Sequence, residues 1–331
     1  MYTDDDLKPR YNPGRLLFAL TALLPLAAGL FMLDGRGILE QGAAALGLMS
    51  ETQVGRMLED IEYNYYYSEV FETDAYQEIR SELTDSPVVS YGEFSEYLVA
   101  LAAMSHDEFS YFYYDSLLAG YSDYSDYEGA DYEDGFETFV QEDLPIIRFN
   151  QFAYDTGTRV TDALQEIHGN GGRIVVFDLT DNPGGIIGEC VMICDALLPE
   201  TDIFEERYND NSRYTYVSDP DMLDFDKIVI LLNGESASCS EIMALTLKEH
   251  LRDKVLLVGS DTYGKQVTQS VEENDRLNYA LYLVTAAWSV EGKSTEHLRG
   301  YLAPWRGKQV DSFDKGFREA RRILGQETKT P

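Results

Sequence analysis

The sequence predicts an α/β protein, because its C-terminal half alternates short apolar runs with amphipathic stretches. Three strand-like runs begin at residues 145, 173 and 227, with the sequences PIIRFNQF, RIVVFDL and KIVILLN. Helical patterns occupy 158–168 and 186–198 between them. Short runs of this kind, bounded by turn residues, indicate strands in a sheet that is covered on both faces.

The α/β domain is expected to span 145–331, with no internal repeat. Later strands are expected within 277–290, LNYALYLVTAAWSV. The stretch 311–324, DSFDKGFREARRIL, has the spacing of an amphipathic helix that closes the chain.

A small helical region is predicted at 34–118. Apolar residues recur there at three- and four-residue steps, over 54–65 and again over 94–102. The Ser-Pro pair at 86–87 predicts a break between helices. The following segment, 119–144, begins with alternating tyrosine and acidic residues and is interpreted as an acidic, Tyr-rich linker. A phosphorylation or metal-binding role for that tract stays open as an alternative.

The N-terminus predicts a membrane anchor. Residues 16–33 carry no charge over 18 positions, close to the minimum that crosses a bilayer as a helix. Three basic residues precede this run and only Arg36 follows it closely, which places 1–15 in the cytoplasm and the rest outside the membrane. A cleaved signal peptide, with small residues at 27–29, is one alternative and a buried core helix is another.

The charge and the cysteine and histidine content of the chain limit which partners and cofactors can be expected. The formal net charge is −33, from 59 acidic and 26 basic side chains, so nucleic acid is not expected to bind. The count of three cysteines is odd, and Cys190 and Cys194 lie four apart in a helical pattern, so no disulfide framework is inferred. The four histidines are scattered and match no metal-binding spacing. We expect no metal and no cofactor, and the sequence leaves the oligomeric state unknown.

Three polar segments each follow a predicted buried strand. DLTDNPGG at 178–185 leaves main-chain N–H groups exposed before a helix, as an oxyanion site requires, although it is also a common turn. NGESASCSEI at 233–242 can hold Ser238 at a helix start, where it can equally serve as an N-cap with Glu241 as its partner. TYGKQVTQ at 262–269 carries a lysine that is usually a solvated turn residue.

Together, the motifs NPGG, SASxSE and YGKxxxQ resemble those of the C-terminal processing (tail-specific) serine proteases, whose fold is related to the crotonase and Clp protease superfamily. The resemblance covers about 145–305 well and 51–118 faintly. It implies that Ser238 is the nucleophile, Lys265 its general base, and Gln269 the residue that orients the lysine. A lysine performs this task only where apolar surroundings favour the neutral amine.

The resemblance also implies an oxyanion hole made of main-chain amides. One is that of Cys239, which follows the nucleophile, and the other belongs to Gly184 in preference to Gly185. Cys239 replaces the family's usual alanine, and the segment between Ser238 and Lys265 is about two residues longer than usual. Family members commonly carry a PDZ domain, but 119–144 is shorter than the roughly 50 residues of a domain, which predicts a member without one.

The expected function is therefore a serine endopeptidase with a Ser-Lys dyad, cleaving an exported or membrane polypeptide through an acyl-enzyme. An inactive, membrane-anchored binding protein for peptides or other ligands on the same fold is the alternative. Acyl chemistry on a thioester, by analogy with crotonases, ranks last because it needs neither the serine nor the lysine.

Overall fold

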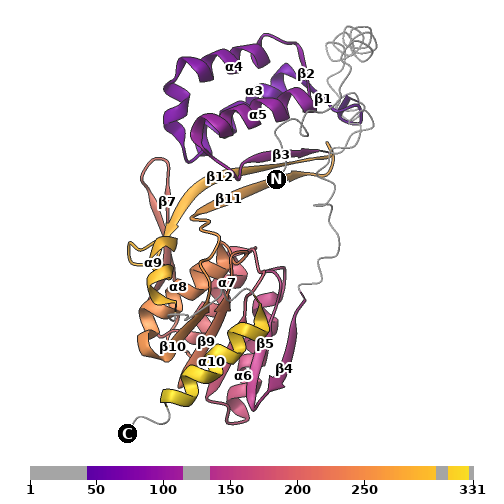
Figure 1. Cartoon of the computed structure of the whole chain (residues 1–331). Helices are drawn as coiled ribbons and strands as arrows, with labels where there is room; N and C mark the ends of the chain where they lie inside the picture. Colours follow the sequence, from indigo (N-terminus) through magenta and orange to yellow (C-terminus); the bar gives the residue numbers. More distant parts are fainter. Residues whose placement is uncertain (1–42, 115–134, 303–311, 328–331) are drawn as a thin grey trace, which may run out of the picture. The chain divides into compact units, whose positions relative to one another are not determined.

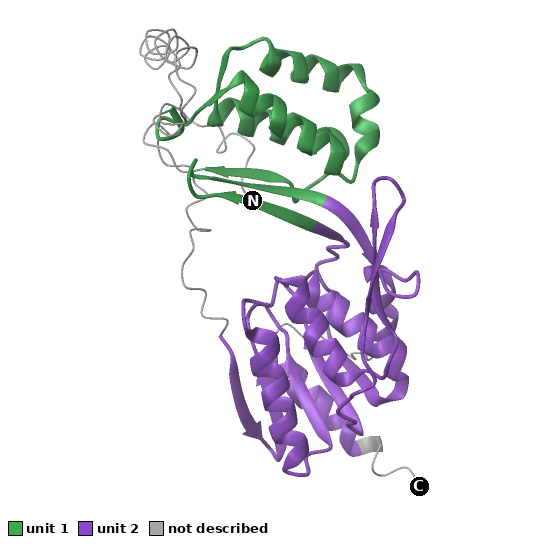
Figure 2. Cartoon of the chain, turned by 180° about the vertical axis from the view of Figure 1, so that it is seen from behind, with its two compact units in different colours: residues 1–126, 269–284 green, residues 127–268, 285–331 purple. Residues whose placement is uncertain are grey.

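The computed structural model describes residues 43–114, 135–302 and 312–327 (Figure 1). The chain divides into two compact units (Figure 2). Unit 1 contains residues 1–126 and 269–284, and unit 2 contains 127–268 and 285–331.

Unit 2 is built on a five-stranded sheet. Its strands are, in order along the sheet, β10 Val255–Gly259, β9 Lys227–Leu232, β6 Ile174–Asp178, β5 Leu144–Arg148 and β4 Glu137–Gln141. The first four strands are parallel and β4 joins the edge antiparallel to β5. Parallel neighbours must be joined by crossovers, which explains the alternation of strands and helices in the sequence.

Helices cover both faces of this sheet. They are α6 Thr156–Gly169, α7 Ile187–Leu197, α8 Cys239–Leu251, α9 Thr295–Tyr301 and α10 Phe313–Glu327. Residues of α6, α7, α8 and α9 share one core with one face of the sheet. On the other face, α10 packs Phe317, Ala320 and Leu324 against the strands (Figure 1). This two-sided burial is the reason why β9 is apolar at nearly every position.

A second sheet has the order β11-β12-β7-β8, with β3 also paired to β12. Its strands are β3 Tyr111–Tyr114, β7 Asp202–Tyr208, β8 Arg213–Val217, β11 Val267–Asn274 and β12 Tyr279–Ser289. Within unit 1, residues 279–282 of β12 pair with β3. Within unit 2, residues 286–289 of β12 pair with β7.

The described part of unit 1 is mainly helical. It comprises β1 Leu48–Ser50, α3 Glu51–Asn64, η1 Ser68–Glu72, α4 Asp74–Thr84, β2 Val88–Ser90 and α5 Tyr91–Ser105. Capping boxes start two of these helices: Ser50 with Gln53 begins α3, and Ser90 with Glu93 begins α5. Their buried faces follow the predicted spacing, because Val54, Met57, Leu58 and Ile61 are all buried in α3.

The α/β class predicted from the sequence is confirmed, and β5, β6, β9, α6, α7 and α10 match the predicted strands and helices closely. The break at 86–87 is also found between α4 and α5. The sequence patterns did not predict β3, β4, β11 or the β7–β8 hairpin, and β4 lies inside the predicted linker. It also divided 277–290 into several strands, whereas β12 is a single long strand. The structure further groups residues 269–284 with the helical unit.

The expected membrane anchor at 16–33 and most of the Tyr-rich tract lie outside the described residues. Within the described ranges, every helix is too short or too polar to cross a bilayer.

Candidate active site

Ser238 lies where β9 meets α8. It is the N-cap residue of α8, with φ 52° and ψ −114°. Only 9% of its surface is exposed to solvent. A positive φ is costly for a residue with a Cβ, on the order of 1–3 kcal/mol, and strain of this kind gathers at functional sites. The peptide after Ser238 opens the helix, so the Cys239 N–H belongs to the first turn, whose N–H groups have no partner within the helix.

A buried polar network fixes the loop that carries Ser238. The Ser236 hydroxyl donates to the Leu179 carbonyl at 2.7 Å and accepts from the Asn233 N–H at 2.9 Å. The Asn233 amide nitrogen donates to Asp181 Oδ1 at 2.7 Å. These bonds join the end of β9 to the turn after β6, and so hold the serine loop beside the glycine turn.

The glycine turn lies against Ser238. Gly184 has φ 99°, and a Cβ there would come within 2.8 Å of Ser238 Cβ and 2.9 Å of the Cys239 nitrogen. Gly185 has φ 144°, and a Cβ there would come within 2.3 Å of the Phe152 carbonyl oxygen. Both positions therefore require glycine, for space and for backbone conformation. The structure thus places Gly184 directly against Ser238 and Cys239.

The two glycine amides differ in their partners. The Gly184 N–H donates to Asn182 Oδ1 at 2.9 Å. The Gly184 carbonyl accepts from Phe152 N–H at 2.9 Å, and Ile186 N–H donates to the Phe152 carbonyl at 2.7 Å. Within residues 43–114, 135–302 and 312–327, no acceptor engages the Gly185 N–H. The amide that the sequence analysis preferred for the oxyanion hole is thus already engaged.

Glu241 connects the serine loop to the lysine loop. Glu241 is fully buried. Its Oε2 atom accepts hydrogen bonds from Ser238 N–H at 2.8 Å and from Lys265 N–H at 3.0 Å. Oε1 accepts from the Thr262 hydroxyl at 2.6 Å and Gly264 N–H at 2.8 Å. Burial raises the pKa of Glu241, although these hydrogen bonds act in the opposite direction. Four donors surround two acceptor oxygens, which is the arrangement that a carboxylate needs when it is buried.

The structure thus brings the main chains of Ser238 and Lys265 to one carboxylate. Lys265 follows Gly264, whose φ is 96°, and is half-buried. Its carbonyl accepts from the indole N–H of Trp288 at 3.0 Å, which ties the lysine loop to the buried end of β12. Gln269 lies in unit 1, where its amide nitrogen donates to the Phe109 carbonyl at 2.6 Å.

The alternative interpretation of Ser238 as a helix cap is also found. Ser238 is the N-cap residue, and the Glu241 side chain accepts from its main-chain N–H as a capping-box partner does. The same carboxylate reaches the lysine loop, so Glu241 has a role that a capping box alone does not require. The sequence pattern contained Glu241 but gave no sign of its partners at 262–265, which are set by the tertiary fold.

All three cysteines are free and buried. The Cys239 thiol donates to the Gly185 carbonyl at 3.3 Å, and the Cys190 thiol to the Cys239 carbonyl at 3.5 Å. Contacts with the Cys194 and Cys239 thiols, together with burial, raise the pKa of the Cys190 thiol well above its usual value. A thiol held neutral in this way acts as a packing group rather than a nucleophile.

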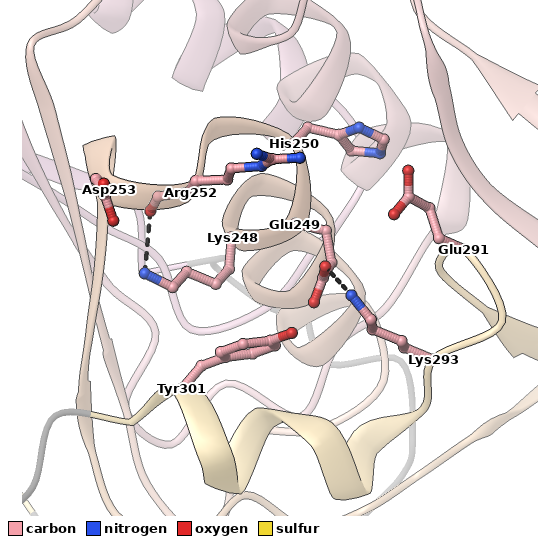
Figure 3. A pocket seen from close by; sticks show the side chains of 8 residues that line it. All are labelled: Lys248, Glu249, His250, Arg252, Asp253, Glu291, Lys293 and Tyr301. Atoms are coloured by element: carbon pink, nitrogen blue, oxygen red, sulfur yellow. Dashed lines mark hydrogen bonds and ion pairs between the residues drawn. The ribbon is translucent and has the colours of Figure 1, made fainter.

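A pocket lined by charged side chains lies at the C-terminal end of α8 (Figure 3). It has a volume of about 410 Å³ and is lined by charged residues of the last turn of α8, with Lys293 and Tyr301. Lys293 forms an ion pair there with Glu249, and Lys248 donates to the Arg252 carbonyl at 3.0 Å. Ser238 lies at the opposite end of this 13-residue helix, roughly 18 Å away at 1.5 Å per residue. The pocket is therefore separate from the candidate active site.

Sequence reasoning missed Asn182. It is fully buried and contacts the glycine turn, the end of β5 and the serine loop. Its position inside the DNPGG stretch was the only available signal, and the residue type alone suggested a turn.

Comparison with known proteins identifies a family whose sequences resemble this part of the chain. Residues 143–300, which include all the predicted site residues, match the model of Peptidase family S41. A carboxy-terminal-processing protease of Bartonella bacilliformis is 32% identical over 165 residues, 46% of this chain and 37% of that protein. A probable CtpA-like serine protease of Staphylococcus aureus is 34% identical over 132 residues, 39% of this chain and 26% of that protein. The chain thus covers between about a quarter and somewhat over a third of these relatives' length.

Solved structures support the same fold. A photosystem II D1 C-terminal processing protease aligns with 83% of this chain and 97% of its own, with a TM-score of 0.59 and 16% identity. A lipoprotein from Streptococcus agalactiae aligns with 84% of this chain and 97% of its own, with a TM-score of 0.57 and 18% identity. With the motifs, the fold and the family match in agreement, residues 143–300 of this chain belong to peptidase family S41.

Proposed function

We propose that the chain is a serine endopeptidase in which Ser238 attacks a peptide carbonyl and Lys265 acts as its general base. The observation that carries this proposal is the convergence of both residues on Glu241, since Ser238 N–H and Lys265 N–H share one carboxylate oxygen. Two main chains that share one acceptor atom lie within the span of two hydrogen bonds. That closeness supports a role for the Lys265 side chain as the base for the Ser238 hydroxyl.

The proposed reaction proceeds through an acyl-enzyme. The Ser238 oxygen forms a bond to the carbonyl carbon while its proton passes to the neutral Lys265 amine. The oxyanion of the tetrahedral intermediate is stabilised by main-chain N–H groups of Cys239 and of the glycine turn. Lys265 then returns the proton to the departing amine, which leaves an acyl-enzyme. Water, deprotonated by the same amine, releases the acyl group and restores Ser238.

The strained conformation of Ser238 supports the proposal independently. Ser238 has φ 52° and ψ −114°, whereas Ser50 and Ser90, which begin helices in unit 1, have the extended backbone typical of N-cap residues. The strain presents the residue beside the glycine turn, where amides can receive negative charge.

The resemblance, together with the uncharged N-terminal run, supplies the remaining parts of the proposal. Gln269 orients the lysine amine, and the substrate is an exported or membrane polypeptide, cleaved near its C-terminus or internally. The run at 16–33 anchors the chain in the membrane with the peptidase domain outside the cytoplasm. Cell fractionation with externally added protease tests the anchor: full-length protein that stays soluble in the cytosol would contradict it.

Turnover of an unfolded protein such as casein by the full-length chain tests the chemistry. We expect Ser238→Ala and Lys265→Ala each to lower kcat by at least about 1,000-fold, since loss of a nucleophile or its base removes the covalent route. The control is Lys254→Ala, because Lys254 forms an ion pair with Asp224 on the surface. Equal turnover by wild type and both site variants would rule the assignment out.

A serine-directed sulfonyl fluoride separates this proposal from an inactive binding protein. An active site would be labelled at Ser238, and Ser238→Ala would stay unlabelled. A chain that binds peptides but is never labelled would favour the binding alternative.

A further inference from the structure

Asn182 is a buried residue that connects the glycine turn to the serine loop. It is fully buried, and its side-chain nitrogen donates to the Phe149 carbonyl at 2.8 Å. Its side-chain oxygen accepts from Gly184 N–H at 2.9 Å. A carbonyl can only accept and a main-chain N–H can only donate, so these two partners fix the orientation of the Asn182 amide.

The main chain of Asn182 reaches the serine loop. Its carbonyl accepts from Ala237 N–H at 3.1 Å and from the Ser240 hydroxyl at 2.9 Å. Ala237 directly precedes Ser238 and Ser240 lies in the first turn of α8. One residue therefore bonds to the glycine turn through its side chain and to both flanks of Ser238 through its carbonyl.

The bonds of the glycine turn determine which amide is left to receive charge. In a trans peptide the carbonyl and the N–H point in opposite directions. The peptide between Gly184 and Gly185 gives its carbonyl to Phe152 N–H, so its N–H, that of Gly185, points away from Phe152. The preceding amide, that of Gly184, is held by Asn182.

We propose that Asn182 is a positioning residue of the oxyanion hole, and that the hole is formed by the Gly185 and Cys239 amides rather than the Gly184 amide. This inference rests on the proposed peptidase function. By holding Gly184 N–H, Asn182 sets the dihedral angles of Gly184 and so aims the next peptide. By holding Ala237 and Ser240, it keeps the Cys239 amide at a fixed distance from that peptide.

If Asn182 only stabilised the fold, its substitution would have a different effect from the loss of a positioning residue. Loss of a buried hydrogen bond lowers stability wherever it occurs, whereas loss of oxyanion positioning weakens the transition state more than the bound substrate. Kinetics therefore separate the two roles, because only the second lowers kcat at nearly constant KM.

The test compares the full-length wild type with Asn182→Ala and Asn182→Asp in casein hydrolysis. We expect Asn182→Ala to lower kcat roughly 100-fold, the magnitude of one lost oxyanion donor, with KM changed by less than about threefold. Thr246→Val is the matched control, because Thr246 is fully buried in α8 and its hydroxyl donates to the Ile203 carbonyl of β7 at 3.1 Å. That variant should keep the wild-type kcat despite its lost hydrogen bond.

The Asn182→Asp variant tests the positioning role if the Asn182→Ala variant does not fold. A protonated carboxyl can donate to the Phe149 carbonyl and accept from Gly184 N–H, as the amide does, but a carboxylate cannot donate. The ratio of variant to wild-type kcat should therefore rise as the pH falls. A ratio that is constant with pH would overturn the inference, as would an Asn182→Ala enzyme with the kcat of Thr246→Val.

The outcomes for the two proposals are distinct. If Ser238→Ala hydrolyses casein as fast as wild type, the proposed function fails and this inference fails with it. If turnover depends on Ser238 but Asn182→Ala behaves like Thr246→Val, only the role of Asn182 is refuted.

Discussion

The main-chain N–H groups of Ser238 and Lys265 converge on one carboxylate oxygen of Glu241, at 2.8 and 3.0 Å. The other oxygen accepts hydrogen bonds from the Thr262 hydroxyl and the Gly264 N–H, so the Glu241 side chain holds the lysine loop in place. Because Glu241 sits in the first turn of α8, the position of the lysine loop is coupled directly to the helix that presents the serine.

Glu241→Gln should therefore impair catalysis. The variant replaces one acceptor oxygen by an NH₂ group, which would face donors with another donor. We expect kcat to fall at least about 10-fold, since a misplacement of 1 Å costs on the order of 100-fold.

The matched control for this variant is Glu249→Gln, a mostly buried glutamate of the same helix that pairs with Lys293. Steady-state kinetics on casein measures both. Equal kcat for the two variants would show that Glu241 only caps the helix.

The pH dependence of stability should also report Glu241. Burial raises its folded pKa above the value of 4.5 in the unfolded chain, so the folded state binds the proton more tightly. The stability that this proton binding contributes is fully present below pH 4.5 and is lost as the pH rises through the folded pKa.

The measurement is the free energy of unfolding by urea, for wild type and Glu241→Gln, at a series of pH values. Relative to the variant, wild type should become less stable as the pH rises above about 4.5. A difference that stays constant, or that changes with the opposite sign, would contradict the raised pKa.

Gly184→Ala should abolish most activity. The added methyl would lie 2.8 Å from Ser238 Cβ and 2.9 Å from the Cys239 nitrogen, and φ 99° is unfavourable for alanine. The turn or the serine loop must shift, and we expect kcat to fall at least about 100-fold.

Gly188→Ala provides the control for that steric effect. Gly188 lies in α7, and a Cβ there meets nothing within 4 Å. It should retain wild-type kcat and gain roughly 0.5–1 kcal/mol of stability from higher helix propensity. Wild-type kinetics for Gly184→Ala would show that the glycine turn does not border the reacting serine.

Arg148→Ala should destabilise unit 2. Arg148 Nε donates to Asp178 Oδ2 at 2.6 Å, and the Asp178 side chain is only 2% exposed at the end of β6. Removing the guanidinium leaves a buried carboxylate without its cation, which costs about 3–5 kcal/mol. Urea unfolding measures this loss.

The comparison for this ion pair is Arg213→Ala. Arg213 pairs with Glu205 at 2.7 Å but is 58% exposed, so its loss should cost less than about 1 kcal/mol. Similar losses for the two variants would mean that the Arg148–Asp178 pair is not what stabilises the strand end.

The sequence by itself determined the α/β class, the approximate extents of β5, β6, β9, α6, α7 and α10, and the three motifs that resemble the C-terminal processing proteases. It could do so because apolar periodicity and turn residues act locally, within a window of a few residues. It placed Ser238 at a helix start and the glycine turn after a strand, and both positions agree with the structure.

Only the tertiary structure decided how those motifs meet. Glu241 joins loops that lie far apart in sequence, and Asn182 engages the Gly184 amide that the motif alone had favoured for charge stabilisation. The sequence also did not indicate that β12 is a single strand that pairs with β3 along one part and with β7 along another. Hydrogen bonds between distant segments depend on strand order and packing, and no local pattern of residues encodes them.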